Sequence, residues 1–195
     1  MIHVIGLGGI GFWLTVGLVR SVPSDQITGW DDDTLVGGRG HMRLPYALPE
    51  TSKVDLLRGF LLVSMGEMSI PHFTKERFTG RGALNPGDLI LDCTDMPRRN
   101  RSLMWTYSKK SGAKCLRASY DGKLSTIVLS SGLPLIAPEE GGYSEIPTLS
   151  LSMAAGGMAA EVVRQYIQRP IEHLDMTISL GEMFVPIQER ILMLE

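Results

Sequence analysis

The sequence predicts an α/β protein with a Rossmann-like, mainly parallel sheet, helices on both faces and antiparallel strands toward the C-terminal end. Three observations predict this fold. Short apolar stretches alternate with helical stretches along most of the chain. The first apolar stretch runs straight into a glycine-rich turn that opens a helix. A second apolar stretch follows that helix closely. We expect all 195 residues to form a single domain.

The first unit of the predicted sheet lies at the N-terminus. Residues 2–6, IHVIG, have the composition of a short buried strand, and residues 9–20, GIGFWLTVGLVR, that of a mostly apolar helix packed on a sheet. SVPSDQ breaks the helix, and residues 27–30, ITGW, form a second strand that ends at Asp31. This order predicts parallel pairing of the two strands through a right-handed crossover.

The remaining stretches continue the alternation. Residues 31–52 form a long loop rich in glycine, proline and charge, and a loop of this length in a compact domain is usually functional or mobile. Pro71 places a strand at 67–73 at an edge of the sheet. The tail predicts two short strands within 175–187, as a hairpin around Gly181. The other predicted elements are helices at 52–66, 97–111 and 147–167, and strands at 88–92, 114–119 and 124–130.

Composition excludes several classes of function. The net charge of −2 offers no basic field for nucleic acid. Cys93 and Cys115 are the only cysteines and form no CxxC pair, so neither a disulfide framework nor a zinc site is expected, and both thiols are expected to lie in the core. No stretch is typical of a signal peptide or a membrane span. We therefore expect a cytoplasmic protein that binds neither nucleic acid nor membrane.

The glycine-rich turn GLGGIG indicates a phosphate-binding loop. It follows a predicted strand and opens a helix, whose N-terminus offers unpaired N–H groups and positive potential to an anion. The first glycines permit a tight turn and close approach of a phosphate, and the last permits close packing of helix and strand. Asp31 lies 20 residues after Gly11, where a carboxylate can accept hydrogen bonds from ribose hydroxyls. The glycines concerned are Gly6, Gly8, Gly9 and Gly11.

A second group of candidate residues follows the strand at 88–92, in LILDCTDMPRRNR. Asp92 and Asp95 lie at the ligand-bearing edge of the sheet, where two carboxylates beside phosphates repel each other unless a cation separates them. Mg²⁺ bound with a nucleoside triphosphate supplies such a cation. Lys53 and Arg43 could clamp the phosphates. Two simpler interpretations remain open: Asp95 caps the next helix, and Lys53 is an exposed lysine at a helix start.

Five segments in order resemble the ThiF/MoeB-type adenylyltransferases, which share the fold of ubiquitin-activating enzymes. They are GLGGIG, DDDTLVGGRGHMR, SKVDLL, LDCTD and IPTLSLSMAAGGMAAEVVRQYI, and the resemblance covers roughly residues 2–168. It implies that a carboxylate attacks the α-phosphate of ATP to give an acyl-adenylate and pyrophosphate. In relatives the carboxylate is often the C-terminal glycine of a ubiquitin-like or sulfur-carrier protein, which makes such a protein tail a possible partner.

The resemblance also implies roles for single residues. Asp31 resembles the carboxylate that binds ribose, and Arg43 the loop arginine that contacts phosphate. Lys53 resembles the lysine that stabilises the leaving pyrophosphate, and Asp95 the aspartate that binds Mg²⁺. The remaining residues expected to bind the nucleotide are Gly6, Gly8, Gly9, Gly11, Asp33 and Arg39.

The sequence departs from the family pattern at several points. The asparagine that usually precedes the loop arginine is missing from GGRGHM, so either Arg39 substitutes for it or the loop register differs by one residue and Asp32 takes the place of Asp31. The family's zinc-binding CxxC pairs and its N-terminal arginine-bearing helix have no counterpart. LIAPEEGGYSEIP contains no cysteine where relatives form a thioester or persulfide, so the reaction is expected either to stop at the adenylate or to pass it to a nucleophile elsewhere.

Three functions remain open on the sequence. The first is an ATP- and Mg²⁺-dependent adenylyltransferase without its own thioester cysteine. The second is a catalytically degenerate, nucleotide-binding partner or scaffold subunit. The third is an NAD(P)-dependent oxidoreductase, which fits GLGGIG and Asp31 but leaves LDCTD unexplained. The small residues of 147–167 and the apolar tail favour a homodimer or heterodimer.

Overall fold

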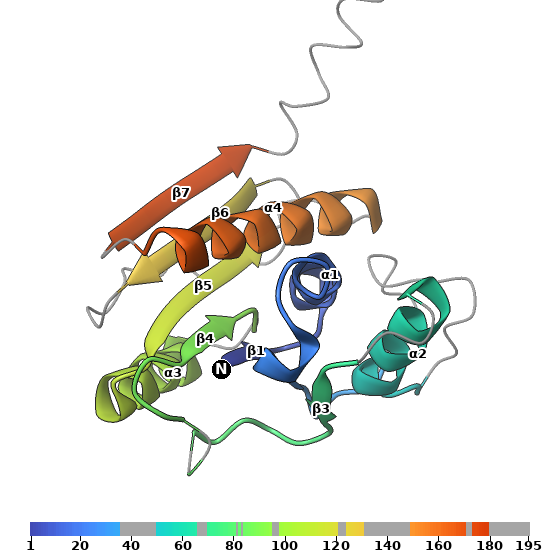
Figure 1. The fold of residues 1–195 in the computed structure, drawn as a ribbon, viewed down its shortest axis with the longest axis horizontal. Helices are drawn as coiled ribbons and strands as arrows, with labels where there is room; N and C mark the ends of the chain where they lie inside the picture. Colours follow the sequence, from blue (N-terminus) through green and yellow to red (C-terminus); the bar gives the residue numbers. More distant parts are fainter. Residues whose placement is uncertain are drawn as a thin grey trace, which may run out of the picture.

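The structure is a computed structural model that describes residues 1–35, 50–65, 70–80, 82, 84–94, 98–120, 124–130, 149–170 and 173–179. Its centre is a seven-stranded sheet in the order β3-β2-β1-β4-β5-β6-β7 (Figure 1). The first five strands in that order are parallel, and β6 and β7 are antiparallel additions, which confirms the predicted fold class. The strands are β1 (Ile2–Ile5), β2 (Ile27–Trp30), β3 (His72–Thr74), β4 (Leu89–Asp92), β5 (Lys114–Tyr120), β6 (Leu124–Ser130) and β7 (His173–Ser179).

Helices cover both faces of the sheet. They are α1 (Gly9–Leu18), α2 (Lys53–Met65), α3 (Arg98–Ser111) and α4 (Leu149–Gln168), with a 3₁₀ turn at Ser24–Gln26. Alternate strand residues face the two layers: Val4 packs with α1, α2 and α4, whereas Ile5 packs with Met104 and Trp105 of α3. All four residues of β1 are buried, as expected for a parallel strand covered on both sides.

The small residues of α4 allow it to pack closely on α1. A Cβ atom added at Gly17 would lie only 2.6 Å from Cβ of Ala160. A Cβ at Gly156 would lie 2.8 Å from the backbone nitrogen of Leu14 and 2.9 Å from the carbonyl oxygen of Ile10. All three distances are shorter than those that real Cβ atoms show, so glycine at these positions sets the distance between the two helices.

Two details of the predicted elements differ in the structure. The edge strand β3 begins after Pro71, later than the predicted start, because proline cannot donate to the ladder. β7 pairs along its whole length with β6, so the sheet itself provides its partner. The second strand of the predicted tail hairpin lies outside the described residues.

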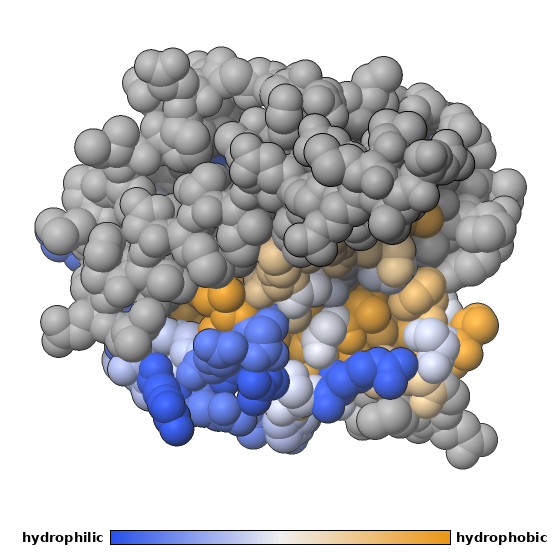
Figure 2. All heavy atoms as spheres, turned by 90° about the horizontal axis from the view of Figure 1, so that it is seen from above, coloured by the Kyte–Doolittle hydropathy of each residue, from blue (hydrophilic) through white to orange (hydrophobic). Residues whose placement is uncertain are grey.

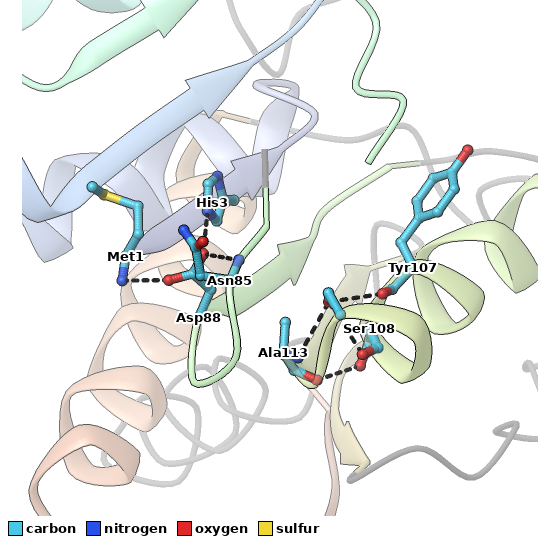
Figure 3. A network of polar contacts seen from close by, with 8 residues as sticks. Met1, His3, Asn85, Asp88, Tyr107, Ser108 and Ala113 are labelled. Carbon is cyan, nitrogen blue, oxygen red and sulfur yellow. Dashed lines mark hydrogen bonds and ion pairs between the residues drawn. The ribbon is translucent and has the colours of Figure 1, made fainter. Parts of the chain in front are cut away.

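Asp88 organises the edge of the sheet where the parallel strands begin (Figure 3). Its Oδ1 accepts a hydrogen bond from the Met1 ammonium at 2.9 Å, and its Oδ2 accepts one from the Asn85 backbone N–H at 2.8 Å. His3 Nε2 lies 3.3 Å from the same Oδ2. These contacts fix the start of β4 beside β1. They lie at the opposite edge from the loop that contains the glycines.

The surface carries polar and apolar side chains close together. Seen from above, hydrophilic side chains gather along the lower edge of the molecule, and hydrophobic ones are visible beside them (Figure 2). The large hydrophobic side chains exposed in the described part of α2 and α4 are Leu62, Val63, Met153 and Ile167. Among the described helices, none is long and apolar enough to cross a membrane.

Candidate functional site

The strand order reverses its direction between β1 and β4. The chain runs outward from β1 through β2 to β3 and then returns to the other side of β1 as β4. In an open α/β sheet, ligands bind outside the carboxyl ends of the strands at such a switch point. The residues that follow β1 and β4 therefore form the candidate site.

The turn after β1 needs glycine at two positions for steric reasons. Gly6 adopts a φ of +86°, and a Cβ there would lie 3.1 Å from the carbonyl carbon and oxygen of Cys93. A Cβ at Gly11 would overlap the Gly6 carbonyl oxygen. The close packing that the sequence predicts for the last glycine is therefore observed. Both positions are packed against other parts of the protein, and Gly8 is the one residue between them that is not buried.

Gly8 is the N-cap of α1 and faces open space, whereas Gly9, the first helical residue, is buried. Apart from its chain neighbours, no atom of the described residues lies within 4 Å of a Cβ built on Gly8. As a glycine, Gly8 also provides no side-chain hydrogen bond to the first turn of the helix. The N–H groups of the first helical turn have no acceptor within a helix. A phosphate placed there would meet free backbone donors and the positive end of the helix dipole. The glycine loop, residues 6–11, thus fits a phosphate group.

Asp31 fastens the glycine loop to the end of β2. Its Oδ2 accepts a hydrogen bond from the Leu7 N–H at 2.6 Å, and its Oδ1 accepts one from the Asp33 N–H at 2.8 Å. Burial raises the pKa of this carboxyl, while Lys53 and the two amides act in the opposite direction. An ionised carboxylate has about four acceptor positions, so Asp31 retains capacity for ribose hydroxyls. Asp32, the alternative, is exposed and lies 3.6 Å from Arg77.

Lys53, the first residue of α2, lies against this acidic group. Its Nζ is 2.7 Å from Oδ2 of Asp33 and 3.6 Å from Oδ2 of Asp31, and its side chain is only 13% exposed. A lysine that merely begins a helix in solvent would not be buried to this extent. The carboxylates of residues 31–33 lie within 4.8 Å of one another, so they could also hold a cation. In the structure the ammonium group of Lys53 pairs with Asp31 and Asp33, and the guanidinium group of Arg77 pairs with Asp32.

The structure thus brings together seven of the ten residues predicted for the site. The glycine loop supplies four of them, and Asp31, Asp33 and Lys53 surround the turn that Leu7 begins, although the role of each in binding is a prediction. Arg39, Arg43 and Asp95 lie outside the described residues.

The partner of the Asp92 carboxylate at the end of β4 is not the metal cation that the sequence suggested. The two carboxylates of LDCTD were expected to need a metal cation between them. Asp92 instead already has a cation: Nη1 of Arg117 donates to its Oδ2 at 2.7 Å, and both side chains are buried. The charge of Asp92 therefore gives no argument for Mg²⁺. Arg117 was missed, and its signal in the sequence was a charged residue in the middle of the apolar strand KCLRAS.

Both cysteines belong to the core, as predicted. Cys93 and Cys115 are buried free thiols, and burial raises the pKa of each. The thiolate is the nucleophilic form, so neither side chain is suited to form a thioester.

A mainly parallel sheet with a glycine-rich loop and a helix N-terminus at its switch point is typical of the Rossmann-like folds that bind nucleotides. Neither protein-family models nor curated protein sequences gave a match to this chain. Solved structures did. E. coli MccB with MccA-N7isoASN matches at a TM-score of 0.70 and 16% identity, over 91% of this chain and 60% of that one. E. coli MccB with ATP matches at 0.66 and 16%, over 92% and 63%. PaaA matches at 0.62 and 15%, over 92% and 60%.

These similarities are similarities of fold. They confirm the predicted resemblance to ThiF/MoeB-type adenylyltransferases at the level of architecture. The chain spans about three fifths of the length of the solved chains that it matches, 60% for MccB with MccA-N7isoASN. One of the matched structures is described as the microcin C7 biosynthetic enzyme MccB in complex with N-formylated MccA.

Proposed function

We propose that the protein is an ATP- and Mg²⁺-dependent adenylyltransferase that activates a carboxylate to an acyl-adenylate. The carboxylate is the C-terminus of a peptide or small protein, such as a ubiquitin-like or sulfur-carrier protein. The observation that carries the proposal is the meeting of Asp31 and Lys53 at the glycine loop, on a fold shared with MccB. The MccB structures with ATP and with MccA support both parts of the proposal.

The reaction joins the substrate carboxylate to AMP. A carboxylate oxygen attacks the α-phosphorus of ATP, the bond from that phosphorus to the bridging oxygen breaks, and pyrophosphate leaves with the electron pair. The protein provides position and charge compensation, which are the main contributions in phosphate chemistry. The N-terminus of α1 holds phosphate oxygens, and Asp31 accepts hydrogen bonds from the ribose.

Positive charge is required where pyrophosphate forms. Lys53 and Arg43 are proposed to compensate the phosphate oxygens, and Asp95 is proposed to bind Mg²⁺, which neutralises phosphate charge when it is bound. In the structure Lys53 pairs with Asp33, an exposed carboxylate, at 2.7 Å. Because the Asp33 carboxylate is 66% exposed, solvent can replace it as a partner, and a triphosphate can therefore compete for the lysine.

Isotope exchange between ATP and pyrophosphate tests the proposal. The wild type is supplied with Mg²⁺ and a set of peptides and carrier proteins with free C-termini, and we expect exchange that depends on one of them. Asp95→Ala should abolish it, while Asp55→Ala should not, because Asp55 pairs with Lys75 on the surface of α2. Exchange that persists in Asp95→Ala would contradict the metal site.

Two other functions make different predictions. An NAD(P)-dependent oxidoreductase is favoured by Asp31 itself, because a carboxylate at the end of the second strand also binds the ribose of a dinucleotide. Binding of NAD(P) but not ATP, measured by calorimetry, would support that function. A catalytically degenerate partner subunit would bind ATP without exchange until its partner is added.

Light scattering at micromolar concentration tests the predicted dimer.

A further inference from the structure

The end of β4 carries a buried ion pair that the proposed reaction does not use. Asp92 on β4 and Arg117 on β5 occupy paired positions in adjacent strands. Their side chains are 0% and 5% exposed, and Arg117 Nη1 lies 2.7 Å from Oδ2 of Asp92. A buried ion pair is by itself weak evidence for stability, because desolvation can cancel the attraction. The structural role of the Asp92–Arg117 pair is therefore inferred from the other hydrogen bonds that the two side chains make.

Both members of the pair also bind Thr94, which lies two residues beyond the end of β4. Arg117 Nη2 donates to the carbonyl oxygen of Thr94 at 3.0 Å. Asp92 Oδ1 accepts from the N–H of Thr94 at 3.1 Å and from its hydroxyl at 2.6 Å. Thr94 is thus held at its N–H, hydroxyl and carbonyl groups. One arginine joins two of the acceptors in this group, as its planar fork of donors permits.

The segment held in this way forms one wall of the glycine loop. A Cβ at Gly6 would lie 3.1 Å from the carbonyl oxygen of Cys93 and 3.1 Å from Cγ2 of Thr94. A Cβ at Gly11 would lie 3.1 Å from Cβ of Cys93. Residues 93–94 therefore pack directly against Gly6 and Gly11, and a shift of these residues toward the loop would displace it.

We propose that Arg117 is a positioning residue for the nucleotide site. By binding Asp92 and the Thr94 carbonyl at once, it holds residues 93–94 against the glycine loop and sets the shape of the loop without touching the nucleotide. The effect on nucleotide binding rests on the proposed function. The effect on residues 93–94 does not.

Cys93 provides a probe of this segment. It lies between Asp92 and Thr94, and its side chain is buried, so a thiol reagent reaches it only when the segment opens. In a Cys115→Ala background it is the only thiol. We expect Arg117→Met to accelerate maleimide labelling of Cys93 about 10- to 100-fold, as loss of a charged hydrogen bond predicts.

The matched control removes a buried carboxylate at the opposite edge of the sheet. Asp88→Asn breaks the contacts with Met1 and His3 in Figure 3 and should leave the labelling rate of Cys93 within about twofold of the parent, because distant sites act independently. Equal acceleration by Asp88→Asn and Arg117→Met would overturn the proposal, since it would indicate general destabilisation.

A double variant separates positioning from charge compensation. Asp92→Asn/Arg117→Met leaves no uncompensated buried charge and keeps a carbonyl oxygen for Thr94, so it should fold even where Arg117→Met does not. Its melting temperature should recover toward that of the parent, while labelling of Cys93 stays fast because the Thr94 carbonyl still has no donor. A double variant that labels as slowly as the parent would overturn the proposal.

Nucleotide binding gives the functional readout. Calorimetry should find that the double variant binds ATP with Mg²⁺ about 10-fold more weakly than the parent. Fast labelling with unchanged ATP affinity would overturn the link between Arg117 and the nucleotide site. A parent protein that does not bind ATP would refute the proposed function instead, and the labelling of Cys93 would still decide whether Arg117 positions the segment.

Discussion

Gly6 and Gly8 lie two residues apart in one loop, yet substitution by alanine should lower the stability of the protein at Gly6 and its affinity for ATP at Gly8. A Cβ at Gly6 meets the Cys93 carbonyl group and Cγ2 of Thr94 at 3.1 Å, and the backbone has a φ of +86°. Gly8 has φ −73° and ψ −158°, which alanine adopts readily, and nothing described lies within 4 Å. The pair therefore separates the stability of the loop from its binding function.

The magnitudes follow from these contacts. At Gly6 the left-handed backbone costs alanine about 1–2 kcal/mol, and crowding against the Cys93 backbone costs about 1–3 kcal/mol. For a domain of this size we expect the melting temperature of Gly6→Ala to fall by roughly 5–15 °C. At Gly8, alanine is a poorer cap but has less conformational entropy to lose, so the free energy of unfolding should change by less than about 1 kcal/mol.

Thermal unfolding and ATP calorimetry of both variants test the reasoning. Gly8→Ala should keep the parent melting temperature and bind ATP at least about 10-fold more weakly, because its methyl group fills the space proposed for phosphate. A Gly6→Ala protein as stable as the parent would refute the steric argument. A Gly8→Ala protein that binds ATP normally would refute the placement of the phosphate.

Three further predictions concern single ionisable side chains. Lys53→Met should lower the rate of ATP–pyrophosphate exchange about 100-fold or more, and it should also lower the melting temperature, because it removes the ammonium group that lies 3.6 Å from the buried Asp31 carboxylate. Asp31→Asn should lower both ATP affinity and the free energy of unfolding, the latter by about 1–3 kcal/mol, since the Leu7 N–H loses a charged acceptor; calorimetry and denaturant titration measure the two effects. Burial lowers the pKa of His3 despite its contact with Asp88, so the unfolded chain binds more protons and stability should fall as pH drops below about 6.5, less so in His3→Gln. An identical pH dependence of melting temperature in parent and His3→Gln would contradict this assignment.

Local patterns in the sequence were sufficient for most of the elements. The strand at residues 27–30 and the strand at 124–130 have the predicted bounds, and Pro71 correctly marked an edge strand. Glycine spacing and the position of Asp31 also identified the loop and its carboxylate. These features depend on periodicity and turn chemistry within short segments, which the sequence displays directly.

Contacts between distant segments were decided only by the tertiary structure. The sequence placed Lys53 near the sheet edge but could not tell whether it was exposed, because its approach to Asp31 depends on how α2 follows the loop. It left the charge of Asp92 without a partner, because Arg117 lies 25 residues away and meets it only through the register of β4 with β5. Sequence periodicity determines which face of a strand is apolar, whereas the order and register of the strands determine which charges are buried together.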